Sequence, residues 1–245
     1  MQIAVVSIFP DLIGQIAEYG VVGRAFERKL LALRCENPRD YADDVHRTVD
    51  DRPYGGGPGM VLKYQPTAQA INVAKAALPA GSPVICLSPQ GHVFDQVAAK
   101  RLSKLDGMVL LAGRYEGLDE RLLENEVDEE LSLGDFVLSG GEIAAMAVID
   151  AVTRLLPGVL GDAESAAQDS FMQGLLDHPH YTRPESIDGK RVPAVLLSGD
   201  HARIERWRHK QALGRSYMRR PELIAKLDLT KEQQKLLDEF LNEQG

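Results

Sequence analysis

The sequence is poor in the residues and patterns that mark several classes of protein. Its 245 residues include two cysteines, Cys35 and Cys86, and these do not form a CxxC pair. Aromatic residues make up only 6% of the chain. No apolar run approaches the roughly 20 residues of a membrane span. The first nine residues carry no Lys or Arg, unlike a signal peptide. We therefore expect a cytoplasmic protein that has no disulfides and does not bind a membrane.

Motifs of common nucleotide, hydrolytic and metal sites are missing as well. The chain contains no GxxxxGK[ST] phosphate loop, no GxGxxG fingerprint after a strand, no GxSxG and no HExxH. His178 and His180 flank Pro179, but no cysteine accompanies them. We interpret this segment as a structural turn and expect no metal ligands.

What is present is a composition suited to folding. Hydrophobic residues make up 44% of the chain and charged residues 26%, which is ordinary for a globular protein. A chain of this length buries about 70–75% of its unfolded surface. It can therefore form one large domain, or a main domain with a smaller second one.

Charge is distributed unevenly along the chain. The formal net charge is −8, and residues 116–135 contain nine acidic residues against a single base, Arg121. Residues 201–221 contain seven bases against one acid, with Trp207 and Tyr217 among them. A basic segment with aromatic residues is typical of contact with a nucleic-acid backbone, although a solvated helix face can have the same composition. RNA therefore stays open as a partner.

Apolar runs, helical patterns and glycine-rich loops alternate along the first 160 residues, which predicts an α/β domain with a mostly parallel sheet. Residues 40–60 are expected to form a long functional loop, because their dense Gly-Pro run cannot lie inside an element. We expect strands at residues 3–9, 30–35, 83–87, 108–112 and 131–133, and helices from residue 11, at 66–78 and at 142–156.

A second domain is expected beyond a linker of small polar residues. We place the first domain at residues 1–160, the linker at 161–175 and a basic helical domain at 176–245. The last part of this domain, residues 221–240, has the pattern of one amphipathic helix.

Three expected strands end in glycine-containing loops, at residues 88–91, 113–117 and 134–141. In open parallel sheets, ligands bind beyond the carboxyl ends of the strands. Glycines let backbone groups approach a ligand closely enough to read an adenine. We expect the loops to converge on an adenosine-type pocket. The alternative is that each loop is an ordinary strand-to-helix turn.

Five segments closely resemble, in order, the bacterial tRNA (guanine-N1)-methyltransferases of the TrmD family. The resemblance runs from the first strand past Arg220, and so many long motifs in one order are specific. The segments are DDRPYGGGPGM (50–60), LSPQG (87–91), GRYEG (113–117), GDFVLSGGE (134–142) and HYTRP (180–184).

The resemblance implies both a fold and a reaction. The fold would be a SPOUT-type α/β domain with a trefoil-knotted, mostly parallel sheet, plus a small helical C-terminal domain. The protein would be an obligate homodimer with the active site at the subunit interface. The enzyme would transfer a methyl group from S-adenosyl-L-methionine to N1 of the guanosine 3′ of the anticodon, position 37 in the anticodon stem-loop of tRNA. This modification protects the reading frame.

Two other functions remain open at this point. One is that of a related SPOUT RNA methyltransferase, acting on another nucleotide or on a ribose hydroxyl. The other is that of a non-catalytic RNA-binding protein in which the glycine loops are only turns.

By match of motif, the resemblance implies that the knot loops bind the cofactor. The family usually has Ile and Tyr where this chain has Leu133 and Phe136, so apolar bulk is kept and a phenolic hydroxyl is lost. Some members also require Mg²⁺, for which Glu116 is a candidate neighbour. The implied cofactor-binding residues are Leu87, Ser88, Pro89, Gly113, Tyr115, Glu116, Leu133, Gly134, Asp135, Phe136, Val137, Leu138, Gly140 and Gly141.

The resemblance assigns the chemistry to Asp169 and Arg154. The Asp169 carboxylate would accept the proton of guanine N1, and the Arg154 guanidinium would stabilise the negative charge that develops on O6. Without the resemblance, Asp169 is most simply a helix N-cap and Arg154 a surface residue near a helix end. The candidate RNA-binding residues are Asp50 and Gly59 for the neighbouring guanosine, and Arg203, Arg208, Lys210, Arg215 and Arg220 for phosphates.

Overall fold

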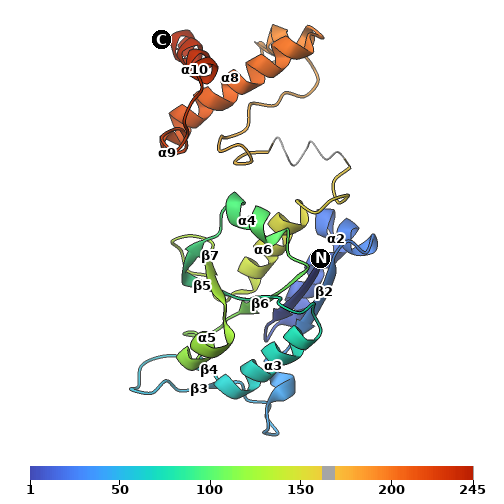
Figure 1. The fold of residues 1–245 in the computed structure, drawn as a ribbon, viewed down its shortest axis with the longest axis vertical. Helices are drawn as coiled ribbons and strands as arrows, with labels where there is room; N and C mark the ends of the chain where they lie inside the picture. Colours follow the sequence, from blue (N-terminus) through green and yellow to red (C-terminus); the bar gives the residue numbers. More distant parts are fainter. Residues whose placement is uncertain (162–168, 245) are drawn as a thin grey trace. The chain divides into compact units, whose positions relative to one another are not determined.

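The structure, a computed structural model, describes residues 1–161 and 169–244 (Figure 1). The chain divides into two compact units, Met1–Gly161 and Asp162–Gly245. None of the helices in the described part of the chain combines the length and hydropathy that a membrane crossing requires.

Unit 1 is built on a five-stranded sheet in which all neighbouring strands are parallel. The strand order is β2-β1-β6-β5-β7. The strands are β1 (Gln2–Val6), β2 (Ala32–Glu36), β5 (Val84–Val93), β6 (Gly107–Ala112) and β7 (Glu129–Ser132). The prediction of an α/β domain with a mostly parallel sheet is confirmed.

Helices cover both faces of this sheet, and alternate residues of the central strands pack against the two layers. In β6, Met108 and Leu110 join one hydrophobic cluster, while Val109 and Leu111 join the other. The first cluster includes residues of α1 (Pro10–Gly14), α2 (Gly20–Glu27), α4 (Gln96–Leu102) and α6 (Glu142–Thr153), and the second includes residues of α3 (Tyr64–Ala76) and α5 (Glu120–Glu126) (Figure 1).

We expected this strand to end at Leu87, but β5 continues to Val93. Pairing with β7 resumes after an irregularity, so that Leu87 and His92 both oppose Leu131. Residues 88–91 therefore form a bulge within a longer strand. Pro89 cannot donate a hydrogen bond to the ladder. A Cβ atom on Gly91 would lie 2.4 Å from the backbone of β7, so the strand can return to its neighbour only because glycine occupies this position.

The Gly-Pro run forms the loop of a short hairpin. Strand β3 (Asp50–Asp51) pairs with β4 (Val61–Leu62) in antiparallel fashion, which leaves residues 52–60 as the connection. Two 3-10 helices complete unit 1, η1 (Gln15–Glu18) and η2 (Pro38–Tyr41). The expected loop is thus present, although it is closed at its base by two strand residues on each side.

Unit 2 is mainly helical. Its core brings together Leu175, Leu213 of α8 and Leu236 of α10. Asp200 caps α8 by accepting a hydrogen bond from the Arg203 backbone nitrogen at 3.1 Å. The elements are β8 (Ser186–Ile187), β9 (Lys190–Arg191), η3 (Ala194–Leu197), α8 (His201–Arg219), α9 (Pro221–Ile224) and α10 (Lys231–Gln244).

The expectation of one helix over residues 221–240 is wrong, because α9 and α10 are separate. The second begins after a capping box at Thr230. The Thr230 hydroxyl accepts from the Gln233 backbone nitrogen at 3.2 Å, and the Gln233 side-chain oxygen accepts from the Thr230 nitrogen at 2.9 Å. The Thr-x-x-Gln spacing indicates the start of a new helix, which the apolar periodicity alone did not reveal.

Packing between α8 and α10 gives a prediction for Gly214→Ala. Alanine is better than glycine inside a helix by about 1 kcal/mol. A Cβ atom here would lie 2.2 Å from the Phe240 ring, so either this ring or the two helices must shift. Because overpacking costs about 1–3 kcal/mol, we expect a net loss of up to about 2 kcal/mol in the free energy of unfolding. Thermal unfolding followed by circular dichroism measures it. The exposed Met218→Ala is the matched control, and a stabilised Gly214→Ala variant would contradict the packing described here.

Candidate functional site

A pocket of about 430 Å³ lies in unit 1 where β5, β6 and β7 meet their loops. Its volume is within the range of sites for small molecules and cofactors. The bulge of β5 and the two loops that follow β6 and β7 all contribute to its wall. Of the implied cofactor-binding residues, all but Asp135 line the pocket. The structure thus brings the three glycine-containing segments together, and the role of each residue stays a prediction.

One buried ion pair joins the loops after β6 and β7. Glu142, at the first turn of α6, is fully buried. Its Oε2 accepts a hydrogen bond from Arg114 Nε at 2.8 Å, and its Oε1 accepts one from the Ser7 hydroxyl at 2.8 Å. Both carboxylate oxygens are therefore satisfied, as a buried charge requires. A carboxylate at this position also interacts favourably with the helix dipole.

Arg114 makes two further contacts that fix the same loops. Its Nη1 donates to the carbonyl oxygen of Ser139 at 3.1 Å, and its guanidinium lies 4.6 Å from the centre of the Phe9 ring. Arg114 thus links the end of β6, the loop after β7 and the segment after β1. Sequence reasoning placed Arg114 and Glu142 in the family motifs but gave them no role, and it missed Ser7.

The backbone of the two loops also meets directly. The Gly141 nitrogen donates to the Gly113 carbonyl oxygen at 2.8 Å. A Cβ atom on Gly141 would lie 2.8 Å from the Cα atom of Ala112, so a larger residue here would separate the loops. The close approach of the two loops therefore explains why position 141 is a glycine, which the motif alone does not.

Apolar side chains stand exposed at the pocket. Tyr115, Phe136 and Val137 line it, and their exposed fractions are 45%, 54% and 87%. Tyr115 has a backbone φ of 62°, in the left-handed region that non-glycine residues rarely adopt. Large apolar groups exposed together around a cavity are typical of a surface that another molecule covers.

The glycine-rich hairpin adjoins this pocket through Glu116. The Glu116 nitrogen donates to the carbonyl oxygen of Met60 at 3.0 Å. A Cβ atom on Gly59 would lie 2.3 Å from the Glu116 carboxylate, so these two candidate residues are immediate neighbours. Asp50 lies at the base of the same hairpin, half-buried and opposite Leu62.

The two candidate catalytic residues belong to different units. Arg154 is the C-cap of α6 in unit 1, and its nitrogen donates to the carbonyl oxygen of Asp150 at 3.1 Å. Asp169 lies in unit 2, where the Met172 nitrogen donates to its carbonyl oxygen at 3.2 Å. Residues 170–173 form a turn, so Asp169 is not the helix N-cap that its sequence context suggested.

The candidate phosphate-binding residues differ in their exposure. Arg203 is exposed and Arg215 is half-buried. Arg208 pairs with Glu205 at 2.7 Å, and Arg220 pairs with Glu222. All four stay candidates, because exposed pairs of this kind are weak and can exchange for a phosphate.

Lys210 is less accessible than these four arginines. It is buried, with 8% of its surface exposed, and its Nζ donates to Glu243 of α10 at 2.5 Å. This ammonium must give up its carboxylate partner before it can replace the counterions of a phosphate backbone. In the structure Lys210 joins α8 to α10, and its contact with a phosphate stays a prediction.

A second group of ionisable side chains lies in unit 2, apart from the expected site residues. It consists of Asp177, His178 and His180. Burial lowers the pKa of the His178 imidazole below its usual range. Burial also opposes ionisation of Asp177, but hydrogen bonds from His180 and from the backbone outweigh it and lower the pKa of this carboxyl. Sequence reasoning considered the two histidines and missed Asp177 beside them.

Comparison with known proteins gives a consistent result. Residues 1–226 match the family described as tRNA (Guanine-1)-methyltransferase TrmD. A protein of Halorhodospira halophila named tRNA (guanine-N(1)-)-methyltransferase is 60% identical over 242 residues, which cover 99% of this chain and 92% of the relative. Proteins of the same name from Methylococcus capsulatus and Idiomarina loihiensis are 58% and 56% identical, covering 99% and 100% of this chain and 97% of each relative.

The buried pair gives an asymmetric prediction. Arg114→Met leaves the fully buried Glu142 carboxylate without a cation and should cost about 3–5 kcal/mol of unfolding free energy. Glu142→Gln should cost less, about 1–3 kcal/mol, because the Arg114 side chain is 21% exposed and can reach water. Urea unfolding measures both variants. Arg121→Met, which removes an exposed partner of Asp119, should leave stability nearly unchanged. Equal losses in all three variants would refute the assigned importance of the Arg114–Glu142 pair.

Proposed function

The chain belongs to the TrmD family of tRNA (guanine-N1)-methyltransferases, and on this premise we propose that it is an enzyme that methylates N1 of a guanosine in tRNA. The methyl donor is S-adenosyl-L-methionine, as in methyltransferases generally. The observation that carries the proposal is the pocket at the strand ends, whose lining consists largely of the segments that carry the family motifs.

The pocket residues fit this donor. Exposed rings of Tyr115 and Phe136 offer flat apolar surface for an adenine, and the glycine loops offer backbone donors and acceptors close to the cavity. The donor carries a positive sulfonium, and the lining supplies the carboxylates of Glu116, Glu120 and Glu130. The one arginine of the lining, Arg114, is already paired with Glu142. The electrostatic balance at the pocket therefore favours a cationic ligand.

In the proposed mechanism, the protein mainly positions the reactants and moves one proton. The bound donor supplies a methyl group already activated by the sulfonium. Guanine N1 carries a proton at neutral pH, and Asp169 accepts it as the nitrogen attacks the methyl carbon. Arg154 stabilises the negative charge that grows on O6 as this proton leaves. Bond formation at N1 and cleavage at sulfur then leave a neutral thioether and a methylated base.

The substrate is held through contacts of two kinds. The hairpin with Asp50 and Gly59 lies beside Glu116 at the pocket, where it can read the nucleotide next to the target. The exposed arginines of unit 2 contact phosphates, which position the RNA without reading its sequence. We propose that the target is the guanosine at position 37 in the anticodon loop of tRNA, and that the reaction takes place in the cytoplasm. An unpaired base in this loop can leave its stack at a cost of only about a few kcal/mol.

We further propose that unit 1 is knotted and works as a homodimer. The chain leaves the sheet edge at β7 and returns to the end of β6, where Gly141 bonds to Gly113 before α6 packs on the sheet. In a trefoil knot, a return of this kind passes through a neighbouring loop, and we propose that it does so here. Phe136 and Val137 are largely exposed beside the pocket, and a second copy of the chain would bury them. Glu116 is the residue that we propose for a neighbouring Mg²⁺.

The proposed reaction is tested directly by mapping the product. Bulk tRNA is incubated with the purified chain and S-adenosyl-L-methionine, and the methylated nucleotide is located by nuclease digestion and mass spectrometry. We expect 1-methylguanosine at position 37. A methyl group on a ribose hydroxyl or on another nucleotide would support the related SPOUT enzymes instead. An absence of any methyl transfer would support a non-catalytic RNA-binding protein.

The role of Asp169 is tested by Asp169→Ala. Removing the base that accepts the N1 proton should lower the methyl-transfer rate by about 10²–10⁴-fold, the contribution typical of general base catalysis. The affinity for S-adenosyl-L-methionine, measured by calorimetry, should stay unchanged, because Asp169 does not line the pocket. Asp188→Asn, at an exposed position in unit 2, is the control. Unchanged turnover in Asp169→Ala would remove the proposed mechanism.

A further inference from the structure

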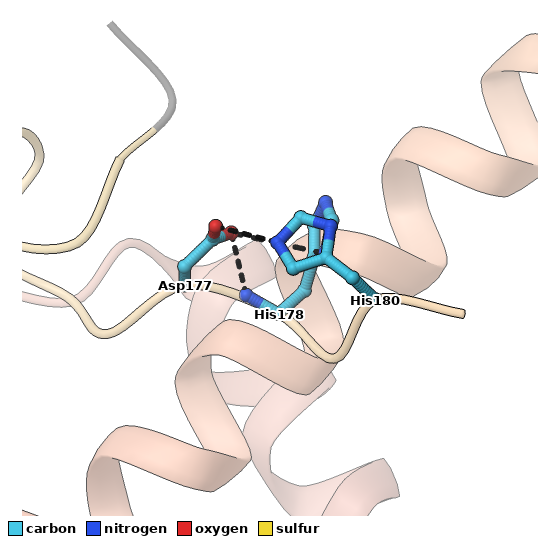
Figure 2. Close-up of side chains that lie close together, drawn as sticks. All are labelled: Asp177, His178 and His180. Atoms are coloured by element: carbon cyan, nitrogen blue, oxygen red, sulfur yellow. Dashed lines mark hydrogen bonds and ion pairs between the residues drawn. The ribbon is translucent and has the colours of Figure 1, made fainter. Parts of the chain in front are cut away.

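Three side chains of unit 2 converge next to α8. Asp177, His178 and His180 each offer one ligand atom, and these atoms lie within 4.8 Å of one another. Figure 2 shows the Asp177 carboxylate against the backbone of His178 and the imidazole of His180. Asp177 Oδ2 lies 2.8 Å from His180 Nε2, and Asp177 Oδ1 lies 3.7 Å from His178 Nδ1. The two imidazole rings are 4.5 Å apart.

One nitrogen in this group is available for a ligand. His178 Nδ1 is buried and has no hydrogen-bond partner among the residues that the structure describes. At 3.7 Å, the Asp177 oxygen is too far away for a hydrogen bond. A buried polar atom without a partner is costly and is rare in folded proteins. An electron-pair acceptor placed between the three side chains would satisfy it.

Hydrogen bonds fix the backbone at Asp177 and His178 and orient the Asp177 carboxylate. The Ser170 hydroxyl accepts from the Asp177 nitrogen at 3.0 Å, and Asp177 Oδ1 accepts from the His178 nitrogen at 2.7 Å. The side chain of His180 is 71% exposed, so its ring can adjust to a ligand at little cost. The Arg208 guanidinium of α8 is a cation close enough to act on His178, and it is paired with Glu205.

We propose that Asp177, His178 and His180 form a binding site for a divalent transition-metal ion of the zinc class. Two imidazoles and a carboxylate are ligands that Zn²⁺ prefers, at about 2.0–2.2 Å from the metal. Three protein ligands leave a fourth tetrahedral position for water or for an external ligand. Mg²⁺ prefers oxygen ligands and does not fit this set. The site is therefore distinct from any Mg²⁺ near Glu116.

Metal binding by the full-length, untagged chain tests the proposal. After treatment with a chelator, the protein is titrated with ZnCl₂ in a calorimeter, and Co²⁺ is used as a spectroscopic probe of tetrahedral nitrogen and oxygen ligands. We expect one Zn²⁺ per chain, and no comparable heat with MgCl₂. His180→Ala and Asp177→Asn should each weaken Zn²⁺ binding by at least about tenfold, since even outer-shell changes at metal sites cost 10–100-fold.

The matched control is His201→Ala, an exposed histidine at the start of α8 in the same unit. It should bind Zn²⁺ as the unchanged chain does. Circular dichroism establishes that each variant is folded, and the largely exposed His180 makes its variant the one least able to disturb the fold. Absence of saturable Zn²⁺ binding, or equal weakening in His201→Ala and His180→Ala, would overturn the proposal.

Discussion

The buried pair between Arg114 and Glu142 is the interaction on which the candidate site depends. Arg114, from the loop after β6 that lines the pocket, neutralises the Glu142 carboxylate, which has no access to water. Ser7 occupies the second oxygen. The buried Glu142 carboxylate therefore joins three segments that are distant in the sequence. Because an uncompensated buried charge is so costly, the loops are held at a fixed separation before any ligand arrives.

The parallel sheet and its layers could be predicted from apolar runs and their spacing, because burial on both faces leaves a direct imprint on composition. The bulge at residues 88–91 could not be predicted in this way. It depends on how closely Gly91 approaches the backbone of β7, and that contact exists only after β5 and β7 pair. The break between α9 and α10 was predictable in principle, since Thr230 and Gln233 have the spacing of a capping box.

For the site, all but one of the cofactor-binding residues implied by motif resemblance line the pocket, because the loops are continuous segments. It did not reveal the groups that hold those loops in place. Ser7 carries no motif, and the structural role of Glu142 follows from a contact across 135 residues. For Lys210 the sequence did not reveal the contact that the side chain makes within the protein. Its charge and its place in a basic segment suggested a phosphate contact, but only packing against α10 shows where its ammonium lies.

The bond between Ser7 and Glu142 also bears on how the chain is made. Synthesis proceeds from the amino terminus at about 5–20 residues per second, so the two partners leave the ribosome roughly 7–27 seconds apart. During that interval the first strand and the serine that follows it have been synthesised, but the carboxylate that this serine will contact has not. The pocket is consequently a late product of translation, and a nascent chain shorter than about 142 residues lacks the means to assemble it.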